Sequence, residues 1–98
     1  MPADAWTALD ALIAERDPYC RGVVLLGLSQ PVDALVQGFR DAKGSRSCRG
    51  FAVGRTIFHD PARDWLAGAI DDAALKARVR ATYESLIDAW RAAMATKP

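Results

Sequence analysis

Two short apolar segments, each introduced by Cys-Arg-Gly, constrain the fold of this chain more than any other feature. The first runs from Gly22 to Leu28 and the second from Gly50 to Gly54, and their Cys-Arg-Gly starts, at Cys20 and Cys48, lie 28 residues apart. Both segments are uncharged and bounded by glycine, a pattern typical of strands covered on both faces in a parallel sheet. The spacing leaves room for the helical crossover that parallel neighbours need.

Four stretches with helical periodicity surround the two apolar segments. Apolar residues recur every three or four positions in residues 5–16, 32–42, 60–66 and 71–94. Pro18 ends the first stretch, and Pro31 and Pro61 stand where the second and third begin. The predicted order is therefore α-β-α-β-α-α, an α/β fold in one domain spanning residues 1–98, of which residues from about 5 to 95 are expected to be ordered.

Two parallel strands alone make an incomplete sheet. They leave both edges of the sheet unpaired, and sheets of fewer than three strands are marginally stable. The sequence therefore predicts a slice of a larger parallel sheet. Three explanations stay open: a fragment, one part of a split protein, or an oligomer that completes its sheet between subunits.

Composition excludes several classes of function. The 98 residues carry 13 basic and 12 acidic side chains, a net charge of +1, so no surface for nucleic acid is expected. Apolar runs such as Val23–Leu26 are far shorter than the ~20 residues that cross a bilayer, so no membrane partner is expected. One histidine and two cysteines fall short of a zinc site, so neither a metal nor a cofactor is predicted. Reduced cysteines fit a cytoplasmic location.

The candidate site lies at the carboxyl ends of the two predicted strands. Six residues follow these strands directly: Gly27, Leu28, Ser29, Gly54, Arg55 and Thr56. Glycines let backbone amides approach an anion closely, and a helix N-terminus carries amides without intrahelical partners. The guanidinium of Arg55 adds charged donors. From the pattern alone two interpretations stay open: a phosphate site, or a packing glycine at Gly54 with a solvated or salt-bridged Arg55.

Two other sets of residues are weaker candidates. His59, beside Asp60, is a candidate general acid or base, and a solvated or capping histidine is the alternative. Cys20 and Cys48 precede neighbouring strands, and we expect small buried hydrophobes there rather than a redox pair.

A longer motif resembles a known family. Its most specific part is the run Gly50-Phe51-Ala52-Val53-Gly54-Arg55-Thr56-Ile57-Phe58. Further matching stretches are residues 62–68, 70–72, 16–18 and 20–28, together with Pro31. Over most of its length, from about Trp6 to Trp90, the chain resembles the aldolase-like domain at the C-terminus of some bacterial 5-dehydro-2-deoxygluconokinases of myo-inositol catabolism.

This resemblance implies a fold and a ligand. The family's domain is similar to class I aldolases of the tagatose-bisphosphate type, so the chain would form the last two strand–helix units of a (β/α)8 TIM barrel. Residues 27–29 would lie in one phosphate-facing loop, and Gly54 and Arg55 in the other. The implied ligand is a phosphorylated sugar acid or ketose of the 5-dehydro-2-deoxygluconate 6-phosphate type, cleaved through a Schiff base in the intact protein.

The nucleophilic lysine of such aldolases has no counterpart here. By the resemblance it stands on the sixth strand, which would precede Met1, and the kinase domain is absent as well. Lys43, Lys76 and Lys97 do not follow a strand. We therefore expect binding without activity of the chain alone, with the remainder of the barrel or a second copy as partner. The alternatives are a non-catalytic interaction or regulatory module that completes a sheet with a partner chain, and a truncated remnant.

Overall fold

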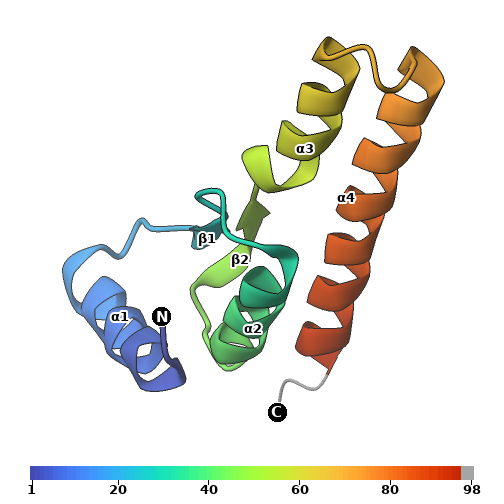
Figure 1. Ribbon diagram of the computed structural model, residues 1–98. Coiled ribbons are helices and arrows are strands. Elements are labelled where there is room, and N and C mark those ends of the chain that lie inside the picture. The colour runs from blue at the N-terminus through green and yellow to red at the C-terminus, as the bar shows by residue number, and fades with distance from the viewer. Residues whose placement is uncertain (96–98) are drawn as a thin grey trace.

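The computed structural model describes residues 1–95 as four helices and two strands (Figure 1). In chain order these are α1 (Ala3–Arg16), β1 (Val23–Leu26), α2 (Val32–Ala42), β2 (Cys48–Ala52), α3 (Arg55–Leu66) and α4 (Asp72–Ala95). The order of elements is the predicted one. The third helix begins at Arg55 rather than at Asp60, and it continues through Pro61. No helix within residues 1–95 combines the length and the apolar character needed to cross a lipid bilayer.

β1 and β2 pair in parallel, with α2 as the crossover between them. Leu25 lies opposite Phe51 and Leu26 opposite Ala52, and the register shifts between Val23 and Val24. Within the described residues the sheet contains these two strands alone. Each strand therefore has one edge without a neighbouring strand.

The predicted fold class, the last two strand–helix units of an α/β (β/α)8 barrel, was wrong. The structure is 64% helical, and its sheet consists of one strand of four residues and one of five. The uncharged segments had indicated strands covered on both faces, but the side chains of Val24 and Leu26 are 52% and 55% exposed. Helices cover only the opposite face of the sheet, so an unbroken apolar run did not require two covered faces.

The main core lies between the covered face of the sheet and helices α2 and α4. Leu35, Phe39 and Leu86 are fully buried there. The ring of Phe39 lies 4.8 Å from that of Phe51 and 5.4 Å, edge-on, from that of Trp90. Such aromatic pairs add about 0.5–1.5 kcal/mol each beyond the burial of their apolar area. The sheet and its two helices are thus joined through one aromatic cluster.

Helix α1 adjoins this core only at its border, where Leu25 and Trp90 pack against both clusters. Its Trp6 packs with Cys48 in a smaller cluster, and its buried Asp10 accepts hydrogen bonds from the Ser45 hydroxyl (2.7 Å) and the Arg46 backbone N–H (2.9 Å). Burial of Asp10 disfavours its charge, but these hydrogen bonds and those from Ser47 outweigh it and hold the pKa below its usual value of 3.8. A charged carboxylate therefore ties α1 to the loop before β2.

Candidate functional site

The carboxyl ends of the two strands meet closely, as parallel pairing requires. The backbone N–H of Gly27 donates to the carbonyl of Ala52 over 3.1 Å. A Cβ atom at Gly27 would lie 2.6 Å from Cγ1 of Val53, so only glycine permits this approach. After β1 the chain enters α2 through a tight turn. After β2 it enters α3 almost directly.

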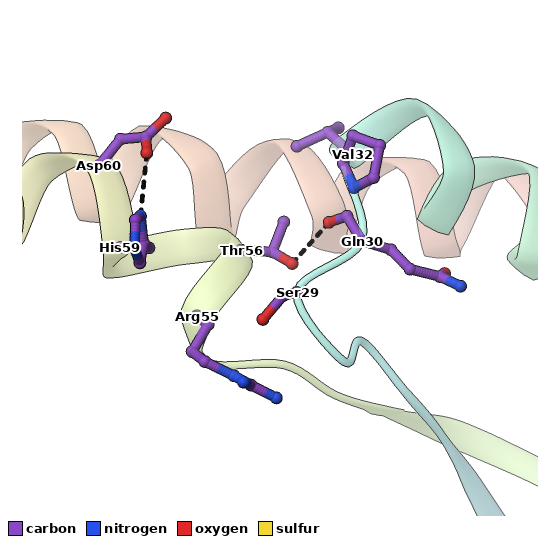
Figure 2. Close-up of a pocket in the computed structure, with 8 residues that line it drawn as sticks. Ser29, Gln30, Val32, Arg55, Thr56, His59 and Asp60 are labelled. Atoms are coloured by element: carbon purple, nitrogen blue, oxygen red, sulfur yellow. Dashed lines mark hydrogen bonds and ion pairs between the residues drawn. The ribbon is translucent and has the colours of Figure 1, made fainter.

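The connection after β1 is a strained turn. The N–H of Gln30 donates to the carbonyl of Gly27 over 3.0 Å, and both central residues, Leu28 (φ 50°) and Ser29 (φ 64°), are left-handed. Such a conformation costs a residue with a side chain roughly 1–2 kcal/mol. The Thr56 hydroxyl donates to the Gln30 carbonyl over 2.7 Å (Figure 2). This bond fixes the turn to the first turn of α3.

A pocket of about 460 Å³ lies between this turn and the start of α3. Its lining residues are Ser29, Gln30, Pro31, Val32, Arg55, Thr56, His59 and Asp60. In Figure 2 the Ser29 hydroxyl points toward the Arg55 side chain, whereas the Gln30 side chain points away from it. The turn after β1 and the start of α3, which are far apart in the sequence, thus bring a hydroxyl and a guanidinium to one opening.

The hydrogen-bond donors around Arg55 have no acceptor within residues 1–95. Neither the Arg55 guanidinium nor the Ser29 hydroxyl has a hydrogen-bond or ion-pair partner in this part of the chain. The N–H groups of Arg55 and Thr56 open α3 and have no intrahelical acceptor. The opening therefore presents a positive charge and several donors to solvent.

An acidic group lies farther along α3. Nδ1 of His59 is 3.1 Å from Oδ1 of Asp60, and both side chains are largely exposed. This hydrogen bond, and then the charge of Arg63, lower the pKa of the Asp60 carboxyl below its usual value, so Asp60 is ionised at neutral pH. In Figure 2 His59 and Asp60 lie to the left of Thr56, whereas the Arg55 side chain extends below it.

The six predicted residues divide into those that line the pocket and those that do not. Ser29, Arg55 and Thr56 line it, although the Thr56 hydroxyl proton is already used in the bond to Gln30. Leu28 instead lines a groove beside β1, because the turn directs it there. Gly27 and Gly54 shape the backbone without lining the pocket, and Gly54 precedes the first residue of α3.

Sequence reasoning did not include three further lining residues, Gln30, Pro31 and Val32. The available signal was Pro31, which marks the start of α2 directly after the first strand. Lys43 and Lys76 lie away from the pocket, and Lys97 lies outside the described residues. Among residues 1–95, no three side chains of the His, Cys, Asp and Glu types gather as a metal site would need.

Comparison with known proteins identifies a family but no activity. No curated protein and no solved structure matches the chain. Residues 1–94 match the bacterial family described as "Uncharacterized protein conserved in bacteria (DUF2090)". Because this match covers almost the whole sequence, the chain belongs to the DUF2090 family.

Proposed function

We propose that the pocket at the start of α3 binds the phosphate group of a phosphorylated sugar or sugar acid. The observation that carries the proposal is that Arg55 and Ser29, whose side-chain donors have no partner in residues 1–95, line one opening at the start of α3. Amides at a helix N-terminus and a guanidinium fork are the donors that proteins use for phosphate. A volume of about 460 Å³ suits a small metabolite.

The pocket also supports a preference for a phosphate that carries an organic group. Pro31 and Val32 form an apolar wall, and Asp60 offers a carboxylate that can accept hydrogen bonds from sugar hydroxyls. The phosphate would lie against Arg55, and the hydroxylated carbon chain would extend toward His59 and Asp60. The resemblance to the domain associated with 5-dehydro-2-deoxygluconokinases supports a phosphorylated sugar acid or ketose of the 5-dehydro-2-deoxygluconate 6-phosphate type as the ligand.

Binding, rather than Schiff-base cleavage, is the function proposed for this chain. A Schiff base needs a lysine amine in contact with the carbonyl of the substrate. The two lysines in the described residues, Lys43 just after α2 and Lys76 on α4, do not line the pocket. We place the protein in the cytoplasm, where phosphorylated sugars are present.

The test is calorimetric titration of the full chain with fructose 6-phosphate and with fructose as the matched compound without phosphate. We expect binding of the phosphorylated sugar alone. A hydrogen bond to a charged group contributes about 1.5–3 kcal/mol, so Arg55→Ala should weaken binding by ~10-fold or more. Arg55→Lys should recover part of the loss, because it keeps the charge without the fork.

Arg91→Ala is the matched control, since Arg91 is exposed on α4 and does not line the pocket. This variant should bind like the wild type. Equal affinities for fructose and fructose 6-phosphate would contradict the phosphate assignment. Unchanged affinity in Arg55→Ala would remove Arg55 from the site.

A further inference from the structure

The edge of β1 that faces away from β2 has no strand partner within the described residues. The N–H groups of Val23 and Gly27 donate to Ser47 and Ala52 on the β2 side. Successive backbone groups of a strand point to opposite edges, so the N–H and C=O groups of Val24 and Leu26 point away from β2. Within the described residues, no strand pairs with them.

A groove runs along this edge. It has a volume of about 460 Å³ and is bounded by α1 on one side, by α2 on the other, and by β1 at its floor. Val24, Leu26 and Leu28 are 52%, 55% and 69% exposed in this region. The groove therefore combines unpaired backbone groups with apolar side chains, which is the combination that an added β-strand recognises.

The edge lacks two of the features with which proteins block strand addition, because Val23–Leu26 contains neither a charged residue nor a proline. An incoming strand carries backbone N–H and C=O groups that can pair with those of Val24 and Leu26.

The exposed area indicates a subunit rather than a finished monomer. The chain exposes 6653 Å², whereas a monomer of 10.6 kDa is expected to expose about 5,500 Å². The excess, about 1,200 Å², is larger than the roughly 800 Å² that each partner buries in a standard interface. The radius of gyration, 16.1 Å, likewise exceeds the ~13 Å of a compact domain of this length.

We infer that β1 pairs antiparallel with β1 of a second copy of this chain, about a two-fold axis that passes near Leu25. Val24 would then exchange backbone hydrogen bonds with Leu26 of the partner subunit, which gives a continuous four-stranded sheet. In a two-fold interface the same edge occurs on both sides, so charges of one sign on the edge would lie close together and repel. The strand Val23–Leu26 carries no charge and avoids this repulsion. The inference is independent of the phosphate pocket.

The test is sedimentation equilibrium of the full chain over a wide range of concentration, with two edge variants. Val24→Pro removes an N–H that points away from β2. Leu26→Lys introduces one lysine per subunit at a half-exposed position, and the two lysines would lie diagonally across the two-fold axis and repel each other. The wild type should be a dimer that dissociates on dilution. Both variants should raise the dissociation constant by at least ~10-fold, the effect of losing about 1.4 kcal/mol.

Leu66→Lys is the matched control, because Leu66 is 78% exposed on α3, outside the groove. It should dimerise like the wild type. Hydrogen exchange gives a readout that needs no variant: the amides of Val24 and Leu26 should exchange more slowly at high protein concentration. A wild type that stays monomeric overturns the inference. This holds even if the edge of β1 binds an added extended peptide. A dimer of unchanged affinity in both edge variants, or open-ended assembly, also overturns it.

Discussion

Replacement of Asp10 by alanine should destabilise the chain by about 2–4 kcal/mol. Two short hydrogen bonds end on this carboxylate, from the Ser45 hydroxyl at 2.7 Å and the Arg46 N–H at 2.9 Å, and a longer one comes from the Ser47 N–H at 3.3 Å. A hydrogen bond to a charged group contributes about 1.5–3 kcal/mol. The Arg46 and Ser47 donors are only partly buried, so water replaces part of what they lose and the expected cost is smaller than the sum over the three bonds.

Urea denaturation followed by circular dichroism measures this change. A domain of this length is stable by roughly 5–15 kcal/mol, so the loss should lower the midpoint clearly while the slope with urea stays the same. Glu15→Ala is the control on the same helix, because the Glu15 side chain is 69% exposed and pairs only with Arg16. A destabilisation of Asp10→Ala no larger than that of the control would refute the role assigned to this carboxylate.

The pH dependence gives a second check on Asp10. Its pKa is lower in the folded chain than the usual 3.8, so the unfolded chain binds the proton more readily. The stability that Asp10 provides is therefore complete above about pH 4 and disappears as the pH falls through the folded-state value. Asp10→Ala should lose less stability on acidification than the wild type. An identical acid slope in both proteins would contradict the argument.

Three further predictions concern other parts of the molecule. Leu28→Gly should stabilise the chain by about 0.5–1 kcal/mol in the same urea assay. The reason is that relief of the left-handed φ of 50° at Leu28 outweighs the added freedom of the unfolded chain. Any loss of stability would contradict the strained turn. Leu86→Ala should cost about 2–5 kcal/mol, since Leu86 is fully buried between α4 and the sheet; a cost below 1 kcal/mol would place it outside the core. Borohydride treatment with dihydroxyacetone phosphate should leave the mass of the chain unchanged by mass spectrometry, and an adduct on any lysine would show that the chain itself forms a Schiff base.

The order of the elements could be predicted from the sequence because each element carries a local signal. Periodic apolar residues and Pro31 gave α2 with its observed bounds. The burial of the strands could not be predicted in the same way. Val24 and Leu25 are equally apolar, yet Leu25 packs against the core and Val24 is half exposed. The difference depends on which face of the sheet the helices cover, and this is a tertiary property.

The candidate site could be predicted in part. Arg55 and Ser29 were recognised because they directly follow predicted strands, whose carboxyl ends meet in a parallel pair. Leu28 was included for the same reason, but the left-handed turn carries it to the groove beside β1. The bonds from Asp10 to the loop before β2 had no sequence signal, since 35 or more residues separate the partners. Only the folded chain brings them together.

The attachment of α1 has a consequence for how the protein opens. This helix is held by the small cluster around Trp6 and by the bonds of Asp10, whereas α2 and α4 share the large core around Phe39. Partial opening can therefore release the N-terminal helix while the aromatic cluster stays intact. Limited proteolysis should first cut between α1 and β1, at residues 17–22, and leave a resistant C-terminal piece.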